Sequence, residues 1–396
     1  MTETILPGSL RGEIPAIGSK SAAHRLLICA ALAKGPTQIL CRETSNDIEA
    51  TRMCLAAMKP DGTLPCGESG STLRFLLPVA AALGLDVTFE MEGRLPQRPM
   101  GPLEEQLSAH GITVTRPTAN TLAICGQLTP GDYVLPGNVS SQFISGLLFA
   151  LPLLDRPSTL TVTGNLESGP YVDMTLEALA QFGVEISVDN QVFSIPAAAY
   201  RSPGTAEVEG DWSNAAFWLC AGALGGPVTV TGLRPDSLQG DKVVFDLLRQ
   251  LGAKTCRSGD RFTVSSAPLR GMEIDAAAIP DLVPILAVTA AAAEGETRIT
   301  NAGRLRLKES DRLETVHRLL LAMGADAEQT ADGLIIRGGK PLTGGTIDSF
   351  GDHRIAMAAA IAGLLCPMTV TGAEAVAKSY PNFWRDYRRL QREEPV

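Results

Sequence analysis

The 396-residue sequence lacks several features that would assign it quickly to a class of protein. It has no CxxC pair and only four histidines, none of them in a His-x-x-x-His motif, so we expect no metal site. No apolar run is long enough to cross a bilayer, and the first residues lack the basic character of a signal peptide. We therefore expect no membrane association.

Charged residues are also scarce, at 19% of the chain, and the net charge is −9. No basic stripe is interleaved with aromatic residues, which make up only 5%, so a nucleic-acid partner is not expected. An anionic ligand would have to be bound in a local basic pocket. The eight cysteines are scattered and stand mostly in apolar runs, which indicates reduced, buried thiols and a cytoplasmic protein.

What the sequence does have is abundant apolar residues, at 45%, and an internal repeat. The length allows two or three domains or a duplicated architecture in two halves. An Ala/Leu-rich helical run, a short turn and a β-branched run recur six times, at 30–40, 80–90, 150–164, 220–232, 290–300 and 359–372. This pattern predicts six α/β units.

A second pattern, helix then glycine then strand, alternates with the first. Its glycines stand where a helix would end on a left-handed cap: Gly111, Gly183, Gly252 and Gly324. The alanine-rich segments 287–293 and 356–362 are apolar nearly all round, so we expect them to be buried helices with sheet outside. No strand is followed by GxGxxG, which argues against a dinucleotide-binding sheet.

Polar segments interrupt the repeat at the ends of predicted elements. A helix is expected to begin near Lys20, which would place Ser21 and Arg25 on one face at its N-terminus, where backbone N–H groups favour an anion. An N-cap plus a surface arginine is the alternative. The glycine- and serine-rich turn 67–74 would let a ligand approach backbone donors, although a plain capped turn explains it equally well.

Three further segments have the same character. The loop 94–100 carries two arginines stiffened by proline, and 137–142 stacks hydrogen-bonding side chains at the start of a helix predicted over 143–151. The run 306–312 has Lys308 and Arg312 four residues apart, although a solvated charge run is the usual explanation. Asp281 is a candidate acid or base because it stands within apolar sequence. These polar segments recur at equivalent positions of the repeat, and this recurrence favours a ligand site over a separate explanation for each segment.

In their order and spacing, these residues resemble the enolpyruvyl transferase family, and within it the members that act on shikimate 3-phosphate. The resemblance covers nearly the whole chain and depends on Gly18 to Arg25, Gly67 to Arg74, Arg98-Pro99, Ser140 to Gln142, Lys308 to Arg312, Asp352 to Arg354 and Lys378 to Pro381. It implies a two-domain inside-out α/β barrel with six βαβαββ repeats, three in each domain. The domains would be residues 19–209 and residues 1–18 with 210–396, with the active site in the cleft between them.

The resemblance implies transfer of the enolpyruvyl group of phosphoenolpyruvate to the 5-hydroxyl of shikimate 3-phosphate, with release of phosphate. This is a step of the shikimate pathway toward aromatic amino acids, and it would need no cofactor. We expect a cytoplasmic monomer.

By the same resemblance, each site residue has an expected role. The contacts to shikimate 3-phosphate are Ser21, Arg25, Ser140, Ser141, Ser168 and Lys308. The contacts to phosphoenolpyruvate are Lys20, Gly70, Arg98, Gln142, Arg312, Arg354 and Lys378. Several arginines suit the carboxylate and phosphate of that substrate, because a guanidinium can donate two parallel hydrogen bonds. Asp281 would be the base for the 5-hydroxyl, and Glu309 and Lys20 would transfer protons at the methylene carbon.

Three positions depart from the enterobacterial-type pattern of this family and are left out of the expected site. Glu68 and Ser69 replace the Asn and Ala of Gly-Asn-Ala-Gly, and Arg304 replaces an Asn. Two alternatives stay open. The UDP-N-acetylglucosamine enolpyruvyl transferases share the donor, but they have Asn after the lysine and usually Cys at the position of Gly93. A non-catalytic anion-binding relative would not need its acids and bases.

Overall fold

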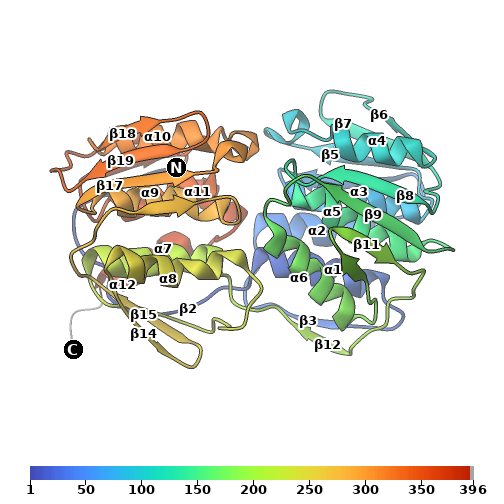
Figure 1. The fold of residues 1–396 in the computed structure, drawn as a ribbon, viewed down its shortest axis with the longest axis horizontal. Helices are drawn as coiled ribbons and strands as arrows, with labels where there is room; N and C mark the ends of the chain where they lie inside the picture. The colour runs from blue at the N-terminus through green and yellow to red at the C-terminus, as the bar shows by residue number, and fades with distance from the viewer. Residues whose placement is uncertain (393–396) are drawn as a thin grey trace. The chain divides into compact units, whose positions relative to one another are not determined.

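The computed structural model describes residues 1–392, and the chain divides into two compact units (Figure 1). Unit 1 consists of residues 1–19 and 209–396, and unit 2 consists of residues 20–208. Each unit is described by itself below.

The described part of unit 2 holds three sheets. The first has the order β4(Gly62–Gly67), β5(Val87–Met91), β7(Thr121–Gly126), β6(Ile112–Thr115), and the second the order β10(Ser187–Asp189), β11(Val192–Ile195), β9(Ser158–Thr163), β8(Asp132–Pro136). The third pairs β12(Thr205–Glu207) with β3(Gln38–Leu40). The helices are α1(Lys20–Leu32), α2(Asn46–Ala57), α3(Gly70–Ala82), α4(Gly101–Ala109), α5(Ser141–Ala150) and α6(Gly169–Gln181), with short 3₁₀ turns η1(Leu95–Gln97) and η2(Leu151–Leu153).

Unit 1 likewise holds three sheets within its described residues. Their strand orders are β1(Thr2–Ile5), β21(Met368–Thr371), β20(Gly345–Asp348); then β14(Lys254–Ser258), β15(Arg261–Ser265), β13(Val228–Thr231), β2(Gly12–Pro15); then β16(Glu273–Asp275), β17(Gly295–Thr300), β19(Leu334–Gly338), β18(Asp326–Gln329). The helices are α7(Trp212–Gly225), α8(Val244–Leu251), α9(Val283–Ala291), α10(Arg312–Ala322), α11(His353–Ala362) and α12(Phe383–Arg392). The 3₁₀ turns are η3(Gly240–Val243), η4(Pro280–Leu282), η5(Gly303–Leu307) and η6(Ala373–Lys378).

In each four-stranded sheet, the two strands that come first along the chain are parallel neighbours. The other neighbouring strands are antiparallel. In the first sheet of unit 2, β4 and β5 are parallel, whereas β7 is antiparallel to both β5 and β6. The same arrangement recurs in the sheet of β16 to β19 of unit 1. A parallel pair needs a long crossover, and the crossover from β4 to β5 is the helix α3. Three such crossover helices, α3, α5 and α11, begin at or next to predicted site residues: Gly70, Ser140 to Gln142, and Arg354.

Both predicted sequence patterns are confirmed. Each of the six Ala/Leu-rich copies folds as a helix followed by a strand, in the pairs α1–β3, α3–β5, α5–β9, α7–β13, α9–β17 and α11–β21. The four predicted helix-ending glycines have φ between 77° and 110°, which only glycine adopts without strain. The mixed α/β class is therefore confirmed, while the inside-out barrel of six βαβαββ repeats stays a prediction.

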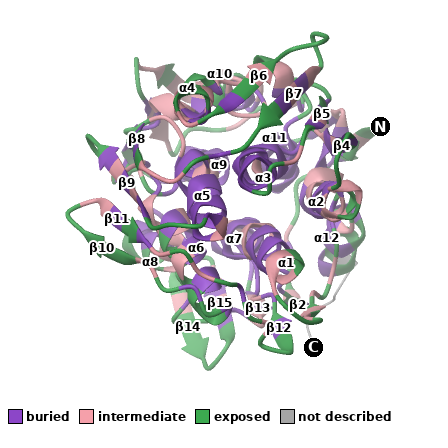
Figure 2. Ribbon diagram, turned by 90° about the vertical axis from the view of Figure 1, so that its right-hand side faces the viewer, coloured by how far each residue is buried: buried purple, intermediate pink, exposed green. Residues whose placement is uncertain are grey.

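The alanine-rich helices are the centres of the hydrophobic cores. Every residue of α9 and of α11 is buried, as predicted from their apolar surfaces, and Figure 2 shows these helices in purple. In unit 2 the helix α3 is buried over all but one of its residues, and α5 packs against it. Charged side chains at the first turns of such helices are held where the protein excludes most water.

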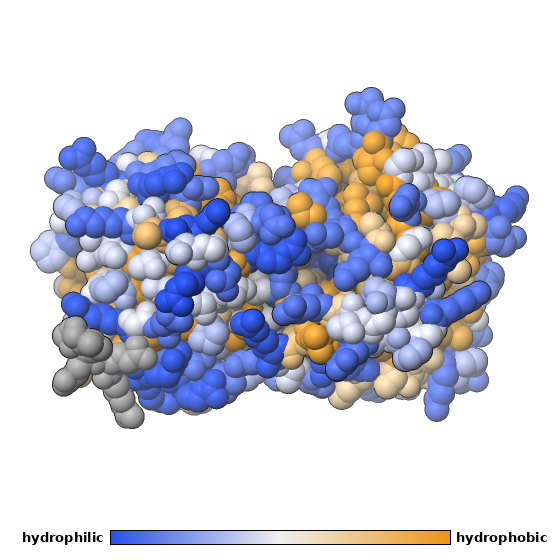
Figure 3. Space-filling model, turned by 90° about the horizontal axis from the view of Figure 1, so that it is seen from below, coloured by the Kyte–Doolittle hydropathy of each residue, from blue (hydrophilic) through white to orange (hydrophobic). Residues whose placement is uncertain are grey.

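The face drawn in Figure 3 is mainly hydrophilic, and apolar side chains show between the polar ones. No described helix is long and apolar enough to cross a membrane. All eight cysteines are free thiols. The prediction that they are buried holds for five of them, but Cys41 is half-buried and Cys125 and Cys256 are exposed, because they lie on outward-facing positions of loops and strands.

Candidate active site

Arg25 of unit 2 is not a surface residue, so the alternative of a capped helix with a solvated arginine is wrong. It lies one turn into α1 with only 3% of its surface exposed. Its Nε donates to Thr175 Oγ1 at 2.9 Å, Nη1 to the carbonyl of Ser21 at 2.6 Å, and Nη2 to the carbonyl of Tyr171 at 2.7 Å. Burial lowers the pKa of Arg25 to about 10, so it stays charged at neutral pH. The guanidinium thereby ties α1 to the first turn of α6.

The serines predicted to bind the acceptor stand at neighbouring helix starts. Ser140 is the N-cap of α5, where its hydroxyl accepts from the N–H of Gln142 at 3.3 Å, and Ser141 is buried beside it. Ser168 precedes α6 with φ of 56°, an unusual conformation for a residue with a side chain. The N–H of Glu167 donates to the carbonyl of Gly137 at 3.1 Å, so the two loops lie side by side.

A second group in unit 2 surrounds Gly70 at the start of α3. A methyl group added at Gly70 would lie 2.6 Å from Arg98 Nη1 and 2.9 Å from Arg74 Nη1, so both guanidinium groups pack against its Cα. Arg74 Nη1 donates to Gln142 Oε1 at 2.8 Å, and Gln142 Nε2 donates to Ser71 Oγ, also at 2.8 Å. The structure therefore brings three predicted residues, Gly70, Arg98 and Gln142, into one cationic group.

Sequence reasoning did not include Arg74 in the site, although it ended a motif used for the resemblance. Arg74 is 3% exposed and also donates to the carbonyl of Pro99 at 3.2 Å, which fixes the loop that carries Arg98. The available signal was an arginine followed directly by the apolar run 75–83, because a charge within apolar sequence is buried only when it has a partner.

The turn before Gly70 is held by a chain of buried hydroxyl groups. Ser69 is the N-cap of α3, and its Oγ accepts from the N–H of Thr72 at 3.3 Å and from Thr72 Oγ1 at 2.7 Å. The oxygen of Thr72 lies 2.7 Å from Thr51 Oγ1, which lies 2.6 Å from Nδ1 of His24. Burial, followed by the charges of Lys20 and Arg25, holds the pKa of His24 well below its usual range, so it is neutral. Ser69 thus anchors the turn to the core.

Lys20 begins α1 and forms an ion pair with Asp47 of α2, with 2.8 Å between Nζ and Oδ2. Both side chains are mostly buried. Asp47 was not singled out from the sequence, because the pair joins residues 27 positions apart and leaves no local signal. The contact fixes the direction of the ammonium group at the helix N-terminus.

In unit 1, three cations surround the carboxylate of Asp281. Arg312 Nη1 donates to Oδ1 at 2.8 Å, Arg354 Nη2 donates to Oδ2 at 2.9 Å, and Lys308 Nζ lies 3.6 Å from Oδ1. Burial alone would raise the pKa of Asp281, but the three positive charges outweigh it and hold the pKa well below the usual range. Asp281 is therefore ionised in this arrangement.

Arg312 is the most enclosed charge of the group, with 1% of its side chain exposed. Besides Asp281 it binds Glu309, with 2.5 Å from Nη2 to Oε2, and Asp352, with 2.8 Å from Nε to Oδ2 and 3.2 Å from Nη2 to Oδ1. Burial alone would lower the pKa of Arg312, but the three carboxylates together raise it. The interpretation of 306–312 as a solvated charge run is therefore wrong for this residue.

Asp352 belongs to a motif that carried the resemblance, but sequence reasoning gave it no role in the site. It is fully buried, it accepts from Ser310 Oγ at 3.0 Å, and as the N-cap of α11 it accepts from the N–H of Arg354 at 3.0 Å. One carboxylate thus positions both arginines that were predicted to bind the donor. An aspartate directly before an apolar helix is an N-cap signal, and that pattern could have found it.

The four-residue spacing of Lys308 and Arg312 suggested a shared helix face, but the two residues do not share one. The helix α10 begins at Arg312 with Asp311 as its N-cap, and Lys308 stands before it in extended conformation. Burial lowers the pKa of Lys308 to about 8, although Asp281 opposes the shift. The ammonium group reaches Asp281 from the loop rather than from the helix.

Lys378 and Asp241 lie next to this group. Lys378 ends η6, and its Nζ donates to the carbonyl of Gly351 at 2.5 Å, three residues before Arg354. Asp241 of η3 accepts a hydrogen bond from Ser213 of α7, and its Oδ1 is buried without a partner among the described residues. Burial and then the charge of Asp281 raise the pKa of Asp241 to about 7. Sequence reasoning missed Asp241, which stands in an ordinary polar loop.

Comparison with known proteins decides the family. The family model described as EPSP synthase (3-phosphoshikimate 1-carboxyvinyltransferase) matches residues 6–63 and 56–387. A 3-phosphoshikimate 1-carboxyvinyltransferase of Clostridium acetobutylicum is 41% identical over 414 aligned positions, which cover 98% of this chain and 96% of that protein. The chain belongs to the EPSP synthase family.

One further relative and one solved structure agree with this assignment, and a second solved structure shares the fold alone. The 3-phosphoshikimate 1-carboxyvinyltransferase of Clostridioides difficile is 38% identical, with 98% of this chain and 96% of that protein covered. The solved structure of EPSP synthase from Acinetobacter baumannii has a TM-score of 0.82 at 28% identity, with 98% of both chains covered. The enolpyruvyl transferase NikO from Streptomyces tendae, at 21% identity and a TM-score of 0.78, covers 98% of this chain and 97% of its own and shares the fold.

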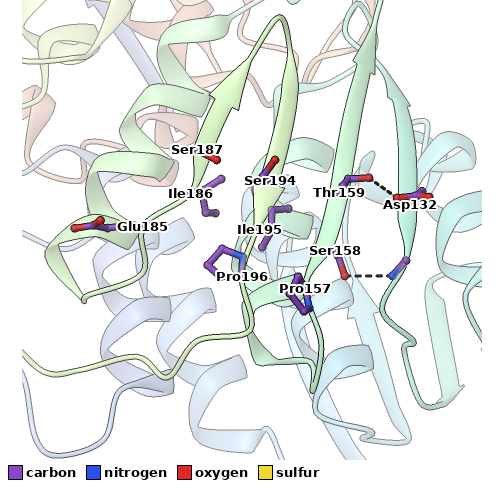
Figure 4. A pocket seen from close by; sticks show the side chains of 11 residues that line it. Asp132, Pro157, Ser158, Thr159, Glu185, Ile186, Ser187, Ser194, Ile195 and Pro196 are labelled. Carbon is purple, nitrogen blue, oxygen red and sulfur yellow. Dashed lines mark hydrogen bonds between the residues drawn. The ribbon is translucent and has the colours of Figure 1, made fainter.

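A hollow of about 600 Å³ on unit 2 lies apart from the predicted residues of the EPSP synthase family site (Figure 4). It lies over β8, β9 and β11 and is lined by side chains such as Asp132, Ser158, Thr159, Glu185 and Ser194. Thr159 donates to Asp132 at 2.6 Å, and Ser158 accepts from the N–H of Gly131 at 3.2 Å. None of the predicted site residues lines this hollow. No group of three or more metal-ligating side chains occurs among residues 1–392.

Proposed function

We propose that this protein transfers the enolpyruvyl group of phosphoenolpyruvate to the 5-hydroxyl of shikimate 3-phosphate and releases phosphate. Membership of the EPSP synthase family supports the reaction. The observation in the structure that carries the proposal is the carboxylate of Asp281 between Arg312, Arg354 and Lys308. A base beside two arginines is what a reaction between a hydroxyl group and a carboxylate-bearing substrate requires.

In this proposal, the helix starts of unit 2 bind shikimate 3-phosphate. Their hydroxyl groups and backbone N–H groups donate to phosphate oxygens, and the buried guanidinium of Arg25 supplies a fixed positive charge. Lys308 of unit 1 adds a second charge to the acceptor. The proposed residues are Ser21, Arg25, Ser140, Ser141, Ser168 and Lys308.

The donor has a carboxylate and a phosphate, so it needs two sets of cations. Each arginine can offer a planar pair of N–H groups, and the lysines act as point charges. The absence of a side chain at Gly70 lets the donor approach the guanidinium groups of Arg98 and Arg74 closely. The proposed donor residues are Lys20, Gly70, Arg98, Gln142, Arg312, Arg354 and Lys378.

The proposed chemistry has an addition step and an elimination step. In the addition, Asp281 takes the proton of the 5-hydroxyl, and the oxygen of that hydroxyl bonds to C2 of phosphoenolpyruvate. Glu309 or Lys20 gives a proton to C3. In the elimination, one of these two groups removes a proton from C3, the double bond forms again, and the C2–O bond to phosphate breaks. The ion pair with Asp47 fixes the position of the Lys20 ammonium group for this transfer.

The test is phosphate release from phosphoenolpyruvate with shikimate 3-phosphate, by the wild-type protein and by Asp281→Ala. A parallel arm replaces the acceptor with UDP-N-acetylglucosamine. We expect release only with shikimate 3-phosphate and its loss in the variant. Release only with the sugar nucleotide would move the function to cell-wall synthesis, and release with neither would favour an anion-binding protein. Action as a cytoplasmic monomer is part of the same proposal.

A further inference from the structure

The two arginines proposed to bind the donor are already bound to carboxylates of the protein. Arg312 has five N–H bonds. Asp352 takes two of them, Glu309 takes one and Asp281 takes one, so at most a single N–H on Nη1 is left for a ligand. A planar carboxylate needs two N–H bonds from one edge of the guanidinium group. Arg312 cannot provide such an edge in this arrangement.

Arg354 is occupied in a similar way. Its Nη2 donates to Asp281 Oδ2 at 2.9 Å, and its Nη1 donates to the backbone carbonyl of Asp281 at 3.2 Å. Asp281 therefore bridges the two arginines, with one carboxylate oxygen on each. The same bonds keep Asp281 a weak base, because they stabilise its ionised form.

We propose that the carboxylate of the donor takes the place of Asp281 and Glu309 on these arginines, and that this exchange frees Asp281 to act as the base. The inference depends on the proposed function. It assigns Asp281 and Glu309 a second role, as anions that occupy the donor position until the donor arrives. No bond is made or broken in the exchange except hydrogen bonds.

The exposure of the three carboxylates separates those that exchange from the one that stays. The side chains of Asp281 and Glu309 are 18% and 19% exposed, whereas that of Asp352 is fully buried. A ligand from solvent can thus reach the first two and cannot reach Asp352, which continues to hold Arg312. Replacing one anion by another also avoids leaving the buried guanidinium without a partner, which would be costly.

The first experiment is calorimetric titration of phosphoenolpyruvate, without acceptor, into the wild-type protein, Asp281→Asn and Glu309→Gln. We expect both variants to bind at least about tenfold more tightly than the wild type, because one competing anion is gone. Glu314→Gln is the matched control, since Glu314 lies on α10 and pairs with the exposed Arg318 instead. Its affinity should equal that of the wild type. Equal or weaker binding by both site variants would overturn the inference.

A crystal structure of the wild-type protein with phosphoenolpyruvate is the second experiment. A donor carboxylate oxygen should lie within hydrogen-bond distance of Arg312 Nη1, with Asp281 Oδ1 beyond it. A bound donor with the 2.8 Å contact between Arg312 and Asp281 intact would refute the exchange. The turnover assay separates the two failures: if the wild type releases phosphate but the variants bind no more tightly, only this inference is wrong.

Discussion

Asp352→Asn is the change that tests most directly how the cationic group of unit 1 is held. The substitution keeps the size of the side chain, and the retained oxygen can still cap α11. It removes the negative charge that faces Arg312, whose side chain is 1% exposed. It also points an amide N–H toward a guanidinium group, so a buried arginine loses its main partner.

The expected cost follows from burial. Removing one partner of a buried ion pair costs about 3–5 kcal/mol. Asp281 and Glu309 still bind Arg312 after this change, so the cost should lie toward the lower end of that range. For a domain of 150–250 residues, each kcal/mol lowers the melting temperature by about 2–4 °C, so a loss of about 6–20 °C is expected. The measurement is thermal unfolding followed by tryptophan fluorescence. All three tryptophans, Trp212, Trp218 and Trp384, lie in unit 1, so the signal reports this unit.

Asp311→Asn is the matched control for this measurement. Asp311 also caps a helix, α10, and also pairs with an arginine, but Arg306 and Asp311 are both more than a third exposed. Exposed pairs contribute about 0–1 kcal/mol, so this variant should unfold almost as the wild type does. If Asp352→Asn loses no more stability than Asp311→Asn, the reasoning from burial is refuted.

Three further predictions concern the substrates and Arg25. Because the pKa of Lys308 is about 8, its side chain is positively charged below that pH and neutral above it. The value of kcat/KM for shikimate 3-phosphate should therefore fall as the pH rises through about 8. The same pH profile in Lys308→Met would contradict this. Gly70→Ala would place a methyl group 2.6 Å from Arg98 Nη1, so steady-state kinetics should show a higher KM for phosphoenolpyruvate with the KM of the acceptor nearly unchanged; equal increases in both would speak against the assignment. Thr175→Val removes the acceptor of Arg25 Nε without changing the shape of the side chain, and should cost about 1–3 kcal/mol in urea unfolding followed by circular dichroism, whereas an unchanged midpoint would show that the hydrogen bond is dispensable.

The sequence was sufficient for local features of the fold. Alternation of alanine-rich runs with β-branched runs predicted six helix–strand pairs. It could do so because the pattern of apolar residues and the strand propensity are both properties of short segments. The left-handed helix ends were predictable for the same reason. Gly183, for example, has φ of 77°, a value that most side chains forbid. How the strands are ordered into sheets depends on pairings between distant segments, and local patterns do not contain it.

The candidate site was predictable in its membership but not in its contacts. Resemblance named Arg312, yet it did not show that three carboxylates bind it, because these come from positions 3, 31 and 40 residues away in the chain. The spacing of Lys308 and Arg312 misled for a related reason. A spacing of four residues brings two side chains together only when both residues lie in one helix. Here the helix α10 begins at Arg312, so Lys308 lies outside it.

The chain of hydroxyl groups from Ser69 to His24 limits how this sequence can evolve. In the enterobacterial-type pattern, alanine stands at the position of Ser69, and alanine could neither cap α3 nor accept from Thr72. A change at position 69 alone would therefore remove the acceptor of the buried Thr72 hydroxyl, which is linked through Thr51 to His24. Residues 69, 72, 51 and 24 are therefore expected to change as a set, because the hydrogen bonds of the core link the serine beside Gly70 to the other three.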